Sequence, residues 1–242
     1  MPFAKCPPGV APVTVQRRYE AAMIESFADT GTLADAAAHA VADTLGEALR
    51  QRGAAALVAT GGRSPGPVYD RLARMHLDWA RVSVTLSDDR CVDAGAPDSN
   101  ASLVRDRLLR GPASAARFLP LWPPEPAALA AIAALRPFDA VILGMGEDGH
   151  IASLIPGDPG LPDGLATTDL TRAVPAGLGS PPIARLTLTL NAILDARAIF
   201  LLIAGEAKRE VLRRVQAGED LPVGRLISQA RAPVRIFWQP GV

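Results

Sequence analysis

The 242-residue chain has little cysteine and no long apolar run. Its two cysteines, Cys6 and Cys91, are too few for a disulfide framework or a cysteine-based metal site, so we expect a reducing compartment and no metal. No stretch approaches the roughly 20 apolar residues of a membrane-spanning helix. Prolines interrupt the N-terminal residues where a secretory signal needs a continuous apolar core. These absences predict a cytoplasmic protein with no membrane partner.

An excess of charge of either sign is also missing. The chain has 25 Lys and Arg residues and 25 Asp and Glu residues, so its formal net charge is zero. This balance excludes a broad basic surface for nucleic acid, although it allows a small cluster of positive charge. Lysine occurs only as Lys5 and Lys208, and histidine only as His39, His76 and His150. Each of these residues can therefore be considered singly.

Short apolar runs alternate with segments of helical pattern, which predicts a mostly parallel sheet with helices on both faces. The predicted strands are 54–59, 81–87, 138–144, 198–205 and 233–238, with 185–190 as a half-exposed strand because it alternates polar and apolar residues. The predicted helices are 32–53, 67–76, 100–110, 126–136 and 206–217. We expect one α/β domain over residues 1–242, with a loose arm at 1–12, an ambiguous segment at 13–27 and a proline- and glycine-rich excursion at 155–182.

Several residues mark the ends of these helices. Thr32 is a possible N-cap and Gly53 a possible C-terminal stop of the first helix. Asp98 or Ser99 can cap the helix at 100–110. Ligand sites in such sheets form where strands end, and the turns 60–66, 87–92 and 144–153 fall at this edge.

The first of these turns matches two patterns. GRSPG has the G-x-S-x-G spacing of a hydrolase nucleophile, which would pair Ser64 with His150 as base. That arrangement uses the N–H of the next residue, and Pro65 has none. We therefore favour a phosphate-binding turn, in which backbone N–H groups at a helix N-terminus hold an anion, with a plain tight turn as the alternative. The residues of this phosphate-binding turn are Thr60, Gly61, Gly62, Arg63 and Ser64.

The turn at 144–153 contains GMGEDG, which has the spacing of a dinucleotide-binding motif. Prolines follow where that motif needs a helix and a second strand, so we expect no nicotinamide or flavin cofactor. His150 is suited to proton transfer near neutral pH, with Asp148 orienting its ring; the alternative is a histidine that caps a following helix. His39 and His76 are expected to be structural.

Two further groups carry charge near predicted strand ends. Ser87, Asp88, Asp89 and Arg90 can bind a polyol phosphate or form a surface ion pair. Lys208 lies in the first turn of a predicted helix, where the helix dipole disfavours a cation, so it indicates either contact with an anion or a solvated side chain.

Together and in order, these turns resemble the 6-phosphogluconolactonase family. The resemblance rests on ATGGRSPGPVYDRL (59–72), SDDRCVDAGAPDSNASLVRDRLL (87–109), FDAVILGMGEDGHIASLIPG (138–157) and RLTLTLNAILDARAIFLLIAGEAKREVL (185–212). GMGEDGHIASLIPG is the most specific of these, since sugar-phosphate deaminases share a DGH turn but continue differently. Departures from the family pattern occur at Arg63, Asp89 and Ile151, and they bear on hydroxyl recognition more than on the reaction type.

The resemblance implies a Rossmann-like fold of the sugar-phosphate isomerase type. It also implies hydrolysis of 6-phospho-D-glucono-1,5-lactone, a small-molecule substrate, without cofactor, metal or obligate protein partner. His150 would be the base and Asp148 its orienting partner, and backbone N–H groups or Arg90 would stabilise the oxyanion. Arg90, Arg185 and Lys208 are the candidate cations for the phosphate. The implied substrate-binding residues are the phosphate-binding turn together with Asp88, Gly146, Arg185 and Lys208. The alternatives are a glucosamine-6-phosphate deaminase or isomerase and a non-catalytic sugar-phosphate-binding module.

Overall fold

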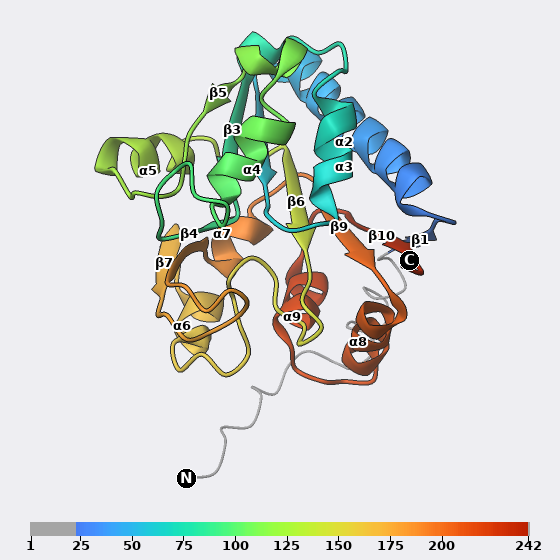
Figure 1. The fold of residues 1–242 in the computed structure, drawn as a ribbon, viewed down its shortest axis with the longest axis vertical. Coiled ribbons are helices and arrows are strands. Elements are labelled where there is room, and N and C mark those ends of the chain that lie inside the picture. The colour runs from blue at the N-terminus through green and yellow to red at the C-terminus, as the bar shows by residue number, and fades with distance from the viewer. Residues whose placement is uncertain (1–22, 242) are drawn as a thin grey trace.

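The computed structural model describes residues 23–241 (Figure 1). The predicted loose arm and most of the ambiguous segment at 13–27 lie outside the described residues. The described end of that segment, Met23–Ser26, is a strand, β1.

A seven-stranded sheet forms the centre of the molecule, and all of its paired strands are parallel. Its strands, in spatial order, are β1, β10 (Val234–Gln239), β9 (Ile199–Ala204), β6 (Ala140–Gly144), β2 (Ala55–Ala59), β3 (Val82–Leu86) and β5 (Arg117–Phe118). Every residue of β2 is buried, as expected for a parallel strand covered on both faces. The predicted parallel α/β architecture is confirmed.

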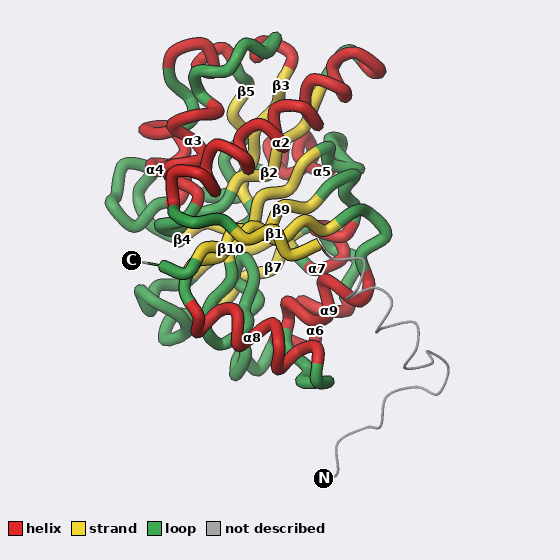
Figure 2. Tube along the Cα trace, turned by 90° about the vertical axis from the view of Figure 1, so that its right-hand side faces the viewer, coloured by secondary structure: helices red, strands yellow, loops and turns green. Residues whose placement is uncertain are grey.

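Helices cover both faces of this sheet (Figure 2). On one face lie α2 (Thr30–Arg52) and α3 (Pro65–Leu72), and on the other lie α8 (Glu206–Gln216) and α9 (Pro222–Gln229). The remaining α-helices near the sheet are α4 (Asn100–Arg107) and α5 (Pro126–Ala133), and short 3-10 turns occupy Trp79–Arg81 and Gly111–Ala115.

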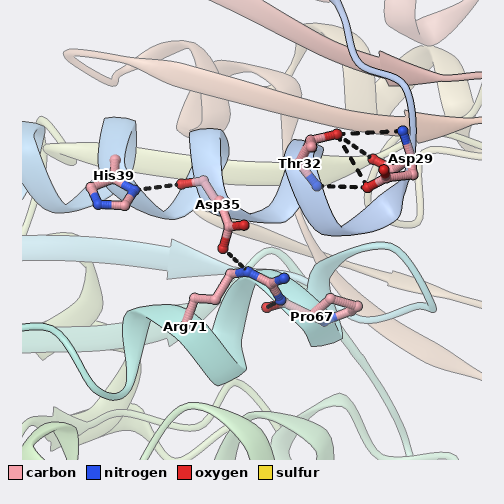
Figure 3. A network of polar contacts seen from close by, with 6 residues as sticks. All are labelled: Asp29, Thr32, Asp35, His39, Pro67 and Arg71. Atoms are coloured by element: carbon pink, nitrogen blue, oxygen red, sulfur yellow. Dashed lines mark hydrogen bonds and ion pairs between the residues drawn. The ribbon is translucent and has the colours of Figure 1, made fainter.

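The longest helix, α2, begins earlier than its sequence indicates. Asp29 is the N-cap, because its carboxylate accepts the Thr32 N–H at 2.8 Å, and Thr32 lies inside the helix (Figure 3). Gly53 ends the helix in a left-handed conformation, as predicted. Asp35 of α2 pairs with Arg71 of α3 and fixes the two helices against each other. The predicted Thr32 cap was therefore wrong, whereas the predicted stop was correct.

The other helix boundaries differ by a few residues. The helix predicted at 67–76 spans Pro65–Leu72, so His76 lies beyond its end. Ser99 caps α4 by accepting the Ser102 N–H at 3.2 Å, as one of the two predicted caps. His39 Nδ1 lies 2.7 Å from the Asp35 carbonyl oxygen within α2, which fits its expected structural role (Figure 3).

A second, antiparallel sheet lies beyond the carboxyl ends of the central strands (Figure 1). It contains β4 (Asp88–Arg90), β8 (Arg185–Leu188) and β7 (Thr171–Val174), with α6 (Leu161–Ala166) and α7 (Leu190–Leu194) beside it. The sequence did not predict this sheet. The strand predicted at 185–190 is confirmed as β8, but its expected half exposure is wrong. All of β8 is buried, and its polar side chains face polar partners rather than solvent.

Candidate active site

One cleft of about 730 Å³ opens at the carboxyl edge of the main sheet. Its walls are the turn after β2, strand β4, the turn after β6 and the first turn of α8, with Gly179 and Ser180 from the excursion on its rim. Every catalytic and substrate-binding residue that the family resemblance implies lines this cleft: Thr60, Gly61, Gly62, Arg63, Ser64, Asp88, Arg90, Gly146, Asp148, His150, Arg185 and Lys208. Segments that are separated by up to about 150 residues in the sequence, from Thr60 to Lys208, therefore contribute to one cleft.

The turn after β6 brings a histidine and a carboxylate together. His150 Nδ1 lies 2.6 Å from Asp148 Oδ1, which also accepts the His150 backbone N–H at 3.2 Å. Burial alone raises the pKa of Asp148, but the hydrogen bond and charge of His150 outweigh it, so the pKa is lowered. The ionised carboxylate places the proton of a neutral imidazole on Nδ1 and leaves Nε2 as an acceptor.

Backbone geometry holds this pair in position. A Cβ on Gly146 would collide with the side chains of both Asp148 and His150, so glycine is needed there. No helix follows His150 directly, since the next one, α6, begins at Leu161. The alternative of a helix-capping histidine is therefore wrong, and the missing helix also excludes the dinucleotide motif.

The turn after β2 is fixed by two residues that the sequence analysis missed. The Tyr69 hydroxyl donates to the Thr60 carbonyl at 2.7 Å and accepts the Thr60 N–H at 2.8 Å. Burial raises the pKa of Tyr69, which keeps it protonated as a donor. The Asn100 side chain packs so closely on Gly61 that a Cβ there would collide with it. The turn is held rigidly from beneath, with Gly62 and Arg63 exposed.

Ser64 lacks the surroundings of a nucleophile. It precedes Pro65, the first residue of α3, which has no N–H to donate to an oxyanion. Among the described residues, no hydrogen bond joins Ser64 to His150, whose ring bonds to Asp148. The geometry favours the anion-binding interpretation of this turn.

Two arginines lie side by side on the second sheet, where Arg90 of β4 pairs with Arg185 of β8. Arg90 donates to the Asp98 carbonyl at 2.6 Å, and Arg185 to the Pro181 carbonyl at 2.8 Å. The Nε atom of each is buried and has no hydrogen-bond partner in residues 23–241. Burial and the neighbouring charge of Arg90 lower the pKa of Arg185. Two neighbouring guanidinium groups repel each other, and an anion in the cleft that both residues line would offset their charge.

The carboxylates beside Arg90 are buried rather than paired on the surface. Asp89 accepts backbone N–H groups from Arg90 at 2.8 Å, Asn100 at 2.7 Å and Ala101 at 3.2 Å. Burial raises the pKa of Asp89 against these bonds, which favour the ionised form. Asp88 is 4% exposed. The alternative of a surface ion pair is therefore wrong, and the role of Asp89 is to join β4 to α4.

Lys208 lines the cleft from the first turn of α8. Its burial lowers its pKa, and the charge of Arg63 acts in the same direction, against the charges of Glu147 and Asp148. Partial burial beside another cation favours contact with an anion over a fully solvated lysine.

The cleft has further lining residues that the sequence analysis did not identify, chiefly Asn100, Glu147, Gly179 and Ser180. Only Glu147 had a usable signal, because it lies between Gly146 and Asp148 in the turn. Within residues 23–241, no three His, Cys, Asp or Glu side chains are grouped to hold a metal ion. None of the described helices is long and apolar enough to cross a membrane.

Comparisons with known proteins show the family to which the chain belongs. The family described as glucosamine-6-phosphate isomerases/6-phosphogluconolactonase matches residues 28–238. A 6-phosphogluconolactonase of Caulobacter vibrioides is 43% identical over 224 residues, covering 89% of this chain and 96% of the relative. One from Pseudomonas putida is 40% identical, covering 91% and 94%. The crystal structure of a Shewanella baltica 6-phosphogluconolactonase superposes with a TM-score of 0.83 at 37% identity, covering 90% of this chain and 97% of that one. The chain belongs to the glucosamine-6-phosphate isomerase/6-phosphogluconolactonase family.

Proposed function

We propose that this protein hydrolyses 6-phospho-D-glucono-1,5-lactone to 6-phospho-D-gluconate in the pentose phosphate pathway. The observation that carries the proposal is the His150–Asp148 pair in the same cleft as Arg90 and Arg185, two cations that face each other on neighbouring strands. The cleft thus offers a general base and an anion site together. Relatives at 38–43% identity named 6-phosphogluconolactonases support this activity.

A lactone is already a reactive ester, so one base and one oriented water suffice. His150 Nε2 takes a proton from a water molecule as the water oxygen forms a bond to C1 of the lactone. The π electrons of the C1 carbonyl move to the carbonyl oxygen. Arg90 and backbone N–H groups of the cleft stabilise the resulting oxyanion. When the carbonyl re-forms, the bond from C1 to the ring oxygen breaks, and that oxygen receives the proton from His150. Asp148 holds the imidazole ring and stabilises its charged form.

The substrate phosphate lies on the turn at 60–64, with Arg185 and Lys208 as its cationic partners. Gly146 has no side chain, so the side chains of His150 and Asp148 can pack against its backbone. Asp88 lines the cleft, but Ser153 Oγ at 2.6 Å bonds one carboxylate oxygen, and Ser87 Oγ at 2.9 Å and Asn100 Nδ2 at 3.4 Å contact the other. Asp88 therefore organises the site rather than abstracting a proton. This arrangement disfavours the deaminase or isomerase alternative, which needs a base for C2.

The coarser properties of the chain complete the proposal. The family match reaches from residue 28 to residue 238, and we propose that residues 1–242 form one domain. We further propose that it acts in the cytoplasm without cofactor or obligate protein partner. A non-catalytic sugar-phosphate-binding module would not need the His150–Asp148 pair.

The test replaces the base and a matched histidine outside the cleft. His150→Ala should lower kcat on freshly made lactone by about 100-fold or more, as expected for losing a general base. His39→Ala, which removes a histidine from α2, should leave the rate unchanged. Acid release is followed at pH 7 after subtracting spontaneous hydrolysis, with circular dichroism to verify folding. A near-normal rate in His150→Ala contradicts the base assignment, and ammonia release from glucosamine 6-phosphate instead of lactone hydrolysis supports the deaminase alternative.

A further inference from the structure

Ser153 lies three residues after His150 on the turn that follows β6, and it is completely buried. The reaction described above uses no atom of this residue. Its hydroxyl is nevertheless bonded to two residues that line the cleft, Asp88 and Arg185. A buried hydroxyl with two charged partners at the edge of an active site calls for a physical role.

The Ser153 hydroxyl links a carboxylate to a guanidinium. It donates to Asp88 Oδ2 at 2.6 Å and accepts a longer bond from Arg185 Nη1 at 3.4 Å. Within the described part of the chain, no direct ion pair joins Asp88 to Arg185. The hydroxyl is therefore the hydrogen-bonded connection between the buried negative charge and the buried positive charge.

The residue before Ser153 has a positive φ, a backbone conformation that residues other than glycine rarely adopt. Ala152 has φ 48°, and it is the only non-glycine residue with positive φ among those the structure describes. This conformation costs on the order of 1 kcal/mol and persists only where surrounding contacts enforce it. One such contact is the Ser153 N–H, which donates to Thr187 Oγ1 of β8 at 3.1 Å. The strained residue thus directs Ser153 toward the second sheet.

Arg185 needs such a restraint. The charge of the neighbouring Arg90 repels it, and its buried Nε–H has no hydrogen-bond partner in residues 23–241. Its other bond, from Nη2 to the Pro181 carbonyl at 2.8 Å, reaches only a loop. With Ser153 removed, the guanidinium loses its connection to Asp88 and to the turn that carries His150.

We propose that Ser153 is a positioning residue that holds Arg185 for the substrate phosphate and fixes its distance from the base turn. This inference rests on the proposed function, because it takes the phosphate contact of Arg185 from it. Ser153 touches no substrate atom; it acts through Arg185.

The first experiment compares Ser153→Ala with Thr85→Val, which removes another fully buried hydroxyl, one that donates to the Leu119 carbonyl. Ser153→Ala should weaken binding of inorganic phosphate, measured by calorimetry, by about tenfold, as for losing one hydrogen bond to a charged group. KM for the phosphorylated lactone should rise by about the same factor with kcat changed less than about threefold. KM for unphosphorylated glucono-1,5-lactone should not change, and Thr85→Val should alter none of these constants.

A double-mutant cycle tests whether Ser153 acts through Arg185. In an Arg185→Ala background, Ser153→Ala should change phosphate affinity less than about twofold. Equal effects in both backgrounds, unchanged phosphate affinity, or equal KM increases for both lactones would overturn the proposal. If Ser153→Ala does not fold, Ser153→Cys, a weaker donor, takes its place, and phosphate affinity equal to the unsubstituted protein then overturns it. Absence of lactone hydrolysis in the unsubstituted protein would contradict the proposed function alone, since the phosphate titration does not depend on catalysis.

Discussion

Two acidic residues near the ends of central strands, Asp148 and Asp89, differ in pKa because their surroundings differ. Asp148 shares a hydrogen bond and a charge with His150, which lowers its pKa, whereas Asp89 is buried among backbone N–H groups that only partly offset desolvation, so its pKa is raised. Sequence patterns identified both as acidic residues near a strand end. Asp148 orients His150, and Asp89 joins β4 to α4. These different roles depend on contacts in space that no local sequence pattern shows.

The lowered pKa of Lys208 predicts how affinity for a phosphorylated ligand changes with pH. Its pKa is lowered from the ordinary 10.5 by burial and by Arg63. As the pH rises through this lowered value, the free protein loses the charge that attracts phosphate, so affinity for 6-phosphogluconate should fall at a lower pH than an ordinary lysine would allow. Lys208→Arg keeps its charge and should remove this decline. Calorimetric titrations from pH 7 to 10 measure the effect, and identical pH profiles for the two proteins would contradict it.

At the scale of elements, the strands that could be predicted are those whose surroundings are apolar. β2, β6 and β9 are continuous buried runs, and the sequence located them within a residue or two. β4 reads Asp-Asp-Arg, which locally resembles a turn. It is a strand only because β8, almost 100 residues later, supplies its hydrogen-bonding partner. The second sheet could therefore not be predicted from the local periodicity of the sequence.

The same limit applied to the site. The three turns could be predicted to meet, because parallel strands end at one edge of the sheet. The contributions of Asn100 and Ser153 could not be predicted. Asn100 packs on Gly61 and Ser153 bonds Asp88, and these partners are distant in sequence.

The excursion at 155–182 yields an element-scale prediction. Arg172 of β7 bonds Asp158 at 2.6 Å, and the Asp158 side chain is 1% exposed. Breaking such a buried pair costs about 3 kcal/mol, which corresponds to a Tm lower by about 6–12 °C in a protein of this size. Asp158→Asn should show this loss in scanning calorimetry. Glu47→Gln, which removes the exposed partner of Arg50, should barely change Tm, and equal Tm values for both variants would contradict the prediction.

For the whole molecule, the cleft joins segments from residue 60 to residue 208, so a bound ligand should resist global unfolding. 6-Phosphogluconate at 100 times its Kd adds about 2.7 kcal/mol to the free energy of unfolding, and Tm should rise by about 5–10 °C. Gluconate, which lacks the phosphate, should raise Tm much less at the same concentration. Calorimetric scans with each ligand provide the measurement, and equal shifts would remove the phosphate from the binding model.

The order of strands also has a consequence for synthesis on the ribosome. Among the described strands, β1 pairs with β10 alone, and β10 lies between β1 and β9. In a nascent chain, residues 23–26 therefore cannot form their described pairing until residues 234–239 have left the exit tunnel. A chain that stalls before residues 234–239 emerge keeps an open edge of β9, the kind of surface that chaperones bind and that aggregates extend.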